Sequence, residues 1–375
     1  MYFEKTYENS REKFLELSHK IQEKYPQTQI ESVLMPPQNT ENLFTDICYI
    51  PNQKSDTLIW MISGTHGIEA YTGSAVQQMI MEEFILSQQN LSASYLFVHS
   101  LNPYGQKNYR RVNENNVDLN RNFVLDDKVF ELKNPDYNKA YARFNDFLNL
   151  PKKYQKKNFE KTRFLLKSFG KIFKEGIKTF RQAVLQGQYE FEKGIFFGGK
   201  SHQAQKQLID ELIKKYFPQY QRIILIDIHT GYGMNGQLHL IGMDEYDRPE
   251  ILKDLQKLYP DHPIEQADKD KGDFYKITGS LFDYIYENSK KYSIKLLPIA
   301  WEFGTNDNIK TLKSLESLQI MMGENQGFHY GYQNDTSKKY MLDKYRNLFY
   351  PDSSIWRNRV LRLSRKTLDT LLQNI

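Results

Sequence analysis

The sequence predicts an α/β protein built on a mixed, mostly parallel, twisted sheet with helices on both faces. Two apolar runs, Thr57–Ile62 and Arg222–Ile228, have the length and composition of buried strands. Apolar residues recur with helical spacing in 70–86 and 203–216. Alternating strands and helices favour a parallel sheet, because each helix carries the chain back across one face.

The other predicted elements follow from the same patterns. An amphipathic helix is expected at about 8–25, where apolar residues are spaced among charges. The remaining elements are strands at 30–34, 43–50, 94–99, 237–241 and 295–301, and helices at 309–322 and 354–372. No internal repeat or Ser/Gly-rich linker interrupts the 375 residues, so we expect a single domain over 1–375 with an insertion at about 125–199.

Composition excludes several classes of protein. With 39% hydrophobic and 26% charged residues, the chain is neither disordered nor fibrous. A net charge of +5 is small for this length, so no nucleic-acid partner is expected. The single cysteine, Cys48, excludes intrachain disulfides and a cysteine-rich zinc site, so any metal must be held by histidine and carboxylate.

The N-terminal segment lacks the basic and apolar regions of a signal peptide, and no apolar run is long enough to span a bilayer. We therefore expect a cytoplasmic protein, or one that is exported without a cleavable signal. The oligomeric state is left open.

The insertion contains a strongly basic stretch. Residues 152–181 hold 11 Lys or Arg against 2 Glu, and phenylalanines interrupt the charges. One interpretation is a basic helix for phosphates or an anionic membrane surface. The other, which we favour, is an amphipathic insertion whose phenylalanines pack on the main domain while its lysines stay in water.

Three predicted strands end on residues that could share one metal. His66 and Glu69 follow the first apolar run on a glycine-flanked turn, His229 ends the second, and Glu302 ends a later strand. The carboxyl ends of parallel strands line one crevice, so these side chains can meet. Two histidines and one glutamate are a recurrent catalytic zinc set, with a further carboxylate available as general base. A second H-x-x-E at His262 has no preceding apolar strand and is left out.

These motifs resemble the zinc carboxypeptidase family, in particular its bacterial cytoplasmic branch, discontinuously from Ile62 to Thr305. The resemblance implies that one Zn²⁺ per chain is bound by His66, Glu69 and His229. It also implies that Glu302 is the catalytic carboxylate.

The segment Val117–Phe123 resembles the substrate loop of that family. By this resemblance, Asn120 and Arg121 hold the terminal carboxylate of the substrate, and Asp118 orients His66. The arginine that polarises the scissile carbonyl falls at Arg111, with the adjacent Arg110 as the alternative.

The segment 275–284 resembles the family's tyrosine loop. Tyr275 would be the side chain that closes over the substrate. Phe282, the seventh residue after it, would line the side-chain pocket and disfavour Lys or Arg side chains. The digestive enzymes have an arginine where this chain has Ile68, and the insertion has no counterpart that we can assign.

The implied function is zinc-dependent hydrolysis of an amide bond next to a carboxylate-bearing residue, as in carboxypeptidases. The substrate would be a peptide or an N-acyl amino acid with a free carboxylate. One alternative is a deacylase of the aspartoacylase type, which acts on small N-acyl amino acids. A second alternative is a non-catalytic binding protein that uses the basic insertion.

Overall fold

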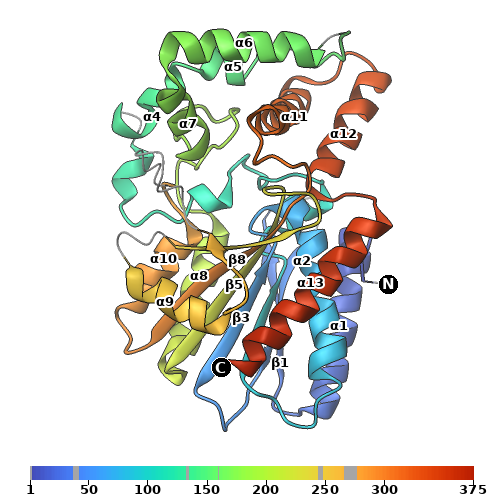
Figure 1. The fold of residues 1–375 in the computed structure, drawn as a ribbon, viewed down its shortest axis with the longest axis vertical. Helices are drawn as coiled ribbons and strands as arrows, with labels where there is room; N and C mark the ends of the chain where they lie inside the picture. Colours follow the sequence, from blue (N-terminus) through green and yellow to red (C-terminus); the bar gives the residue numbers. More distant parts are fainter. Residues whose placement is uncertain (1, 37–41, 132–134, 159, 244–247, 266–276) are drawn as a thin grey trace.

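The computed structural model describes residues 2–375 except 37–41, 132–134, 159, 244–247 and 266–276 (Figure 1). The described residues form one eight-stranded sheet in the order β1-β2-β4-β3-β5-β8-β6-β7. Its centre, β4-β3-β5-β8, is parallel. The pairs β1-β2, β2-β4 and β6-β8 are antiparallel, and β7 pairs parallel to β6. The predicted fold class, a mixed sheet with a parallel centre, is confirmed. The strands are β1 (Gln29–Met35), β2 (Leu43–Ile50), β3 (Thr57–Ser63), β4 (Ser94–His99), β5 (Arg222–Thr230), β6 (Leu238–Gly242), β7 (Ile264–Glu265) and β8 (Lys295–Phe303).

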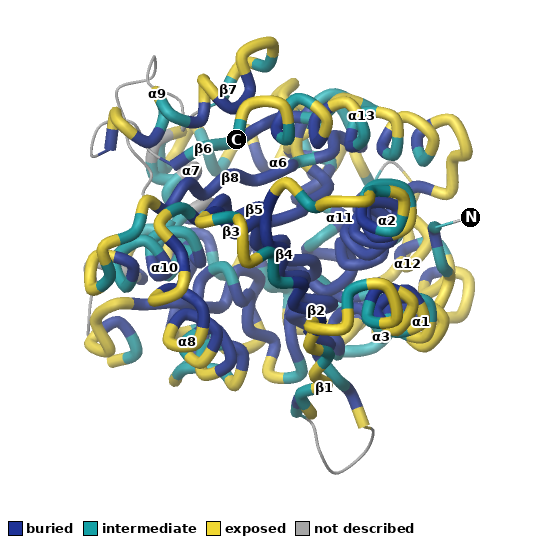
Figure 2. The backbone as a smooth tube through the Cα atoms, turned by 90° about the horizontal axis from the view of Figure 1, so that it is seen from below, coloured by how far each residue is buried: buried dark blue, intermediate teal, exposed yellow. Residues whose placement is uncertain are grey.

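Both faces of the sheet are covered by helices. Successive side chains of a strand point to opposite faces, and here both sets are apolar, so each face needs a layer of helices to bury it. In β3, Ile59 and Met61 join one hydrophobic cluster, and Leu58 and Trp60 join the other. The first cluster is completed by α1 (Tyr7–Lys24), α2 (Ala70–Ile80), α9 (Pro249–Leu258) and α13 (Ser354–Gln373). The second is completed by α8 (Ala204–Tyr216) and α10 (Leu281–Ser289). Figure 2 shows the buried strands running between these helices.

The insertion folds into short helices at one end of the molecule (Figure 1). Its helices are α4 (Pro135–Ala142), α5 (Asn145–Leu148), α6 (Glu160–Glu175) and α7 (Ile177–Leu185), and they pack against α11 (Thr311–Tyr330) rather than against the sheet. Phe164 and Phe180 are buried in this contact, as expected for an amphipathic insertion. Phe169 and Phe173 are not, since they are 48% and 95% exposed. The expectation that the phenylalanines pack inward is therefore wrong for these two, while Phe159 lies outside the described residues.

The predicted helices and strands are present, mostly with small shifts at their ends, but the helix predicted at 309–322 is α11, which continues to Tyr330. The helix expected at 70–86 is α2 followed by a π-helical turn at Met81–Ile85. Two short helical segments that matter for the site are α3 (Pro103–Lys107) and the turn Leu119–Arg121. Helices that the sequence analysis did not anticipate include α9, α10 and α12 (Asp335–Phe349). Within the described part of the chain, every helix is too short or too polar to serve as a membrane span.

Candidate metal centre

The turn after β3 brings the first H-x-x-E motif close to the loop that begins at Asn102. A Cβ on Gly67 would lie 2.3 Å from the backbone of Gly105, so only glycine allows this approach. The backbone N–H groups of Gly67 and Ile68 then donate to the carbonyls of Arg111 and Arg110 at 3.0 and 2.8 Å. These bonds place the arginine pair beside the motif, although more than 40 residues separate them in sequence.

His66, Glu69 and His229 converge as expected. All three are buried, and one ligand atom from each lies within 4.8 Å of the others. The Nδ1 of His66 is 3.0 Å from one carboxylate oxygen of Glu69, and the Nδ1 of His229 is 3.1 Å from the other. The two ring centroids are 5.0 Å apart. Two imidazole nitrogens and a carboxylate directed at one point are the donors that zinc prefers, so these residues fit a zinc ion.

The opposite nitrogen of each histidine faces an aspartate. His66 Nε2 is 3.3 Å from Asp118 Oδ1, and His229 Nε2 is 2.7 Å from Asp227 Oδ2. Thr65 in turn donates to both oxygens of Asp227 at 3.0 Å. A carboxylate on the far nitrogen fixes the ring orientation and leaves Nδ1 for a metal. The sequence analysis missed Asp227, although residues two apart on a strand share one face and Asp227 stands two before His229.

The buried charges shift one another's pKa values. Burial lowers the pKa of His229, and the carboxylates of Asp227 and Glu69 raise it. The carboxylates have the larger combined effect, so the pKa of His229 is raised well above its usual value. Burial disfavours the ionised form of Glu69, but the two histidines outweigh it and lower its pKa. The pKa of Asp118 is likewise held well below its usual value, with Arg111 and His66 overcoming the effect of burial.

Glu302 reaches the same site from the neighbouring strand. It is the direct parallel partner of His229 between β5 and β8, so both side chains project to one face. Its Oε1 accepts a hydrogen bond of 2.9 Å from the backbone N–H of Tyr232. Burial, followed by repulsion from Glu69, raises the pKa of Glu302 to about 8. A carboxylate with a raised pKa beside a metal set is suited to proton transfer near neutral pH.

The structure distinguishes the two adjacent arginines. Arg111 faces the site, where its Nε donates to Asp118 Oδ2 at 2.9 Å and its Nη2 lies 2.6 Å from His66 Nε2. Arg110 points the other way and is 2% exposed. Its Nε donates to Glu324 of α11 at 2.9 Å.

The expected carboxylate clamp lies on the Leu119–Arg121 turn. The side-chain oxygen of Asn120 accepts from the backbone N–H of Leu281 at 3.0 Å, which ties the turn to the start of α10. Arg121 is buried, and its Nη1 donates to the carbonyl of Asn120 at 2.8 Å. Burial, opposed by Asp118, lowers the pKa of Arg121.

The insertion approaches Arg121 directly. A Cβ on Gly187 would lie 2.7 Å from Arg121 Cδ, and the hydroxyl of Tyr189 donates to the Arg121 carbonyl at 2.6 Å. Phe282 lies on α10, partly buried against both faces of the core. Tyr275 lies outside the described residues.

The second H-x-x-E motif makes a different contact. Glu265 is 2.5 Å from Nδ1 of His239, on the adjacent strand, and His239 Nε2 accepts from the backbone N–H of Met234. The motif therefore does not bring His262 and Glu265 together with a third ligand among the described residues.

A family model described as "Protein of unknown function (DUF2817)" matches residues 3–363. A search of curated proteins finds no match. Among solved structures, bovine thrombin-activatable fibrinolysis inhibitor in complex with tick carboxypeptidase inhibitor is similar at 12% identity, with 92% of this chain and 99% of that chain covered and a TM-score of 0.45. Carboxypeptidase A from Helicoverpa armigera is similar at 12% identity, with coverages of 82% and 71% and a TM-score of 0.43. An aspartoacylase family protein from Mesorhizobium loti has 12% identity, coverages of 81% and 67%, and a TM-score of 0.39.

Proposed function

Since the chain belongs to the family described as "Protein of unknown function (DUF2817)", its activity has to be inferred from the site, and we propose that it is a zinc-dependent hydrolase of the carboxypeptidase type. It would cleave an amide bond next to a residue that carries a carboxylate. The observation that supports this most strongly is the convergence of His66, Glu69 and His229 with Glu302 beside them.

Zinc, when bound by the two histidines and Glu69, would lower the pKa of a water molecule and polarise a carbonyl. Glu302 would accept the proton of the attacking water and pass it to the leaving amine, a role that its position directly beside His229 supports. Asp118 and Asp227 would hold the two imidazole rings in the orientation that leaves Nδ1 for the metal.

Arg111 would stabilise negative charge on the carbonyl oxygen, because a guanidinium offers several donors close to the metal set. In this structure its Nη2 is directed at the nitrogen of His66 that Asp118 also faces. That nitrogen must carry a proton if Nδ1 is to bind a metal, so we expect Arg111 to turn away from His66 in the metal-bound enzyme.

Asn120 and Arg121 would hold the carboxylate of the substrate, and Tyr275 would close over it. We propose these roles on the sequence resemblance and on the position of the Leu119–Arg121 turn beside Asp118. Phe282 would line the side-chain pocket.

The deacylase alternative is favoured by one observation. Arg121 is buried beneath Gly187 and Tyr189 of the insertion, which limits the space beside the proposed clamp. A small N-acyl amino acid needs less space than an extended peptide.

The test is the metal content of the purified full-length protein, followed by amino acid release from a mixed panel of peptides and N-acyl amino acids with and without a chelator. We expect about one zinc per chain and release that the chelator abolishes. H66A should lose the metal, because a two-ligand site is too weak to retain it. Stoichiometric zinc in H66A would refute the ligand assignment, and a metal-free, inactive wild-type protein would favour the binding-protein alternative.

A further inference from the structure

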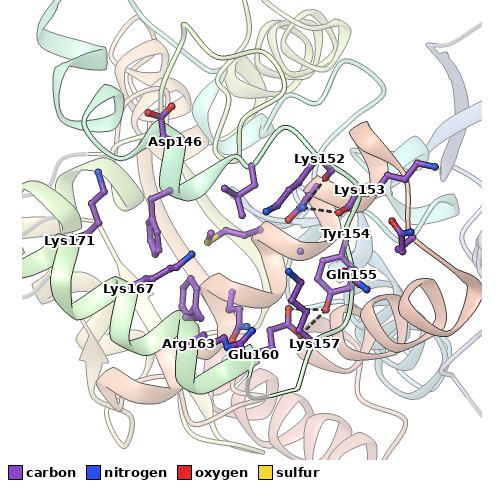
Figure 3. Close-up of a pocket in the computed structure, with 18 of the residues that line it drawn as sticks. Asp146, Lys152, Lys153, Tyr154, Gln155, Lys157, Glu160, Arg163, Lys167 and Lys171 are labelled. Carbon is purple, nitrogen blue, oxygen red and sulfur yellow. Dashed lines mark hydrogen bonds between the residues drawn. The ribbon is translucent and has the colours of Figure 1, made fainter.

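A large cavity lies between α6 and α11, and the proposed hydrolase does not use it (Figure 3). Its volume is about 870 Å³, within the range of roughly 300–1,000 Å³ that is typical of small-molecule sites. We call it the α6 cavity. Seven of its lining residues are basic, namely Lys152, Lys153, Lys157, Arg163, Lys167, Lys171 and Lys174, and two are acidic, Asp146 and Glu160.

The basic residues come from two sides. Arg163, Lys167, Lys171 and Lys174 recur every three or four positions along α6, so they share one face of that helix. In Figure 3, Arg163, Lys167 and Lys171 lie on α6 across the cavity from the segment that carries Lys152 and Lys157. An anion that entered between them would meet positive charge from both sides.

Six of the seven cations are exposed to solvent, and Lys171 donates to the carbonyl of Arg143. Among the described residues, no ion pair joins any of the seven cations to a carboxylate. Of the two acidic residues, Glu160 is held by the hydroxyl of Tyr154, which lies 3.0 Å from both its oxygens. Clustered like charges repel one another, and a bound anion would relieve that repulsion.

Beside the charges, the cavity has an apolar wall. The rings of Phe147 and Phe164 stack with centroids 5.4 Å apart, and Leu150 and Met322 line the cavity next to them. Gly170, on the basic face of α6, leaves open space where a side chain would project. A bare phosphate would leave this apolar surface unused.

We propose that the α6 cavity binds an anionic amphiphile, a molecule with a phosphate or carboxylate group on a hydrocarbon body. The lysines and Arg163 would bind the anionic group, and the hydrocarbon would lie on Phe147, Phe164 and Leu150. Such a ligand could be a free molecule or the exposed end of a membrane lipid, and both present the same chemistry.

The test is calorimetric titration of the full-length protein with dodecyl phosphate below its micelle concentration. Inorganic phosphate and dodecanol are the controls for the anion alone and for the chain alone. We expect dodecyl phosphate to bind at least about tenfold more tightly than either, because it uses both parts of the cavity. Equal binding of inorganic phosphate or of dodecanol would overturn the proposal.

Three variants test where the ligand binds. K167E reverses one cavity charge and should weaken binding of dodecyl phosphate about tenfold or more. K253E makes the same change of net charge on exposed α9 and should leave binding unchanged. G170L should weaken dodecyl phosphate binding by filling the cavity, without a clash that would unfold the chain. Equal binding by K167E and K253E, with no effect of G170L, would place the ligand elsewhere and overturn the proposal.

Two further arms identify the source of the ligand. In the first, the protein is sedimented with phosphatidylglycerol or phosphatidylcholine vesicles. Binding to phosphatidylglycerol vesicles alone, lost in K167E, would support the proposal and indicate a membrane lipid. Binding of dodecyl phosphate without vesicle binding would support it and indicate a free amphiphile. Displacement of dodecyl phosphate by a single-stranded oligonucleotide that itself binds more tightly would overturn it in favour of nucleic acid.

Discussion

The strand-end site and the α6 cavity both gather charged side chains, but they balance those charges differently. At the strand ends, His66 and His229 each lie between Glu69 and a further aspartate, so each histidine has a carboxylate oxygen within 3.3 Å of both ring nitrogens. In the α6 cavity, seven cations face two carboxylates, and none of the seven has an ion-pair partner among the described residues.

The difference indicates whether the opposite charge in each region comes from the protein itself or from a bound ligand. The strand-end site is held in place by its own carboxylates, as a site that must present fixed ligand atoms requires. The cations of the cavity have no ion-pair partner among the described residues and are mostly exposed to water, so an incoming anion can reach them. We therefore interpret the first region as a preorganised reaction centre and the second as a site for a ligand from outside.

The largest effect is expected for E302Q, which tests whether the strand-end site is catalytic. The substitution keeps the size of the side chain but removes its ability to accept a proton, so turnover of any substrate found in the panel should fall about 10²- to 10⁴-fold. Metal content should stay at the wild-type level, because Glu302 is not one of the three grouped ligands. E250Q, on the exposed start of α9, is the matched control. Wild-type activity in E302Q would show that the proton acceptor is a different group.

R110M tests how much a buried cation that is paired with a carboxylate contributes to stability. Arg110 and Glu324 form a buried pair at 2.9 Å, so removing the arginine leaves Glu324 without a counterion. We expect unfolding free energy to fall by roughly 3–5 kcal/mol in urea denaturation. The double variant R110M/E324M should recover most of this loss. A change below about 0.5 kcal/mol in R110M would contradict the view that the pair carries compensated buried charge.

A smaller effect is expected for D227N, which tests whether the aspartates behind the histidines matter for the metal. The amide can no longer hold the ring of His229 as a carboxylate does, so zinc affinity should fall about 10- to 100-fold in chelator competition. The exposed substitution D369N on α13 should leave zinc affinity unchanged. An unchanged affinity in D227N would mean that the carboxylate of Asp227 is not needed to orient His229 for the metal.

The sequence predicts much of the strand-end site, because each of its side chains directly follows or ends an apolar run that can be recognised from neighbouring residues. Apolar runs predict the strands, and the ends of parallel strands predict that His66, His229 and Glu302 meet. The choice between Arg110 and Arg111 could not be made in this way. It depends on Glu324, which lies 214 positions later in the chain and holds Arg110 away from the site.

The insertion shows the limit of periodicity. Helical spacing predicts that α6 is amphipathic, but it does not state which face meets a partner. Packing against α11 buries Phe164 and leaves Phe173 exposed, although both phenylalanines stand in the same basic stretch. The cavity depends on this docking, so no local pattern could have indicated it.

The smallest effect is expected for K167M, which contrasts an uncompensated cation with the buried Arg110. Lys167 lines the α6 cavity and has no ion-pair partner among the described residues. Its removal therefore leaves no carboxylate without a counterion. It also relieves repulsion from its basic neighbours on α6. We expect the unfolding free energy, measured in the same urea experiment without ligand, to stay within about 0.5 kcal/mol of wild type or to rise slightly. Dodecyl phosphate should stabilise the wild-type protein more than K167M, because only the wild type keeps the full set of cations. A loss comparable to that of R110M would mean that Lys167 supports the fold itself, and the contrast between paired and unpaired cations would fail at this residue.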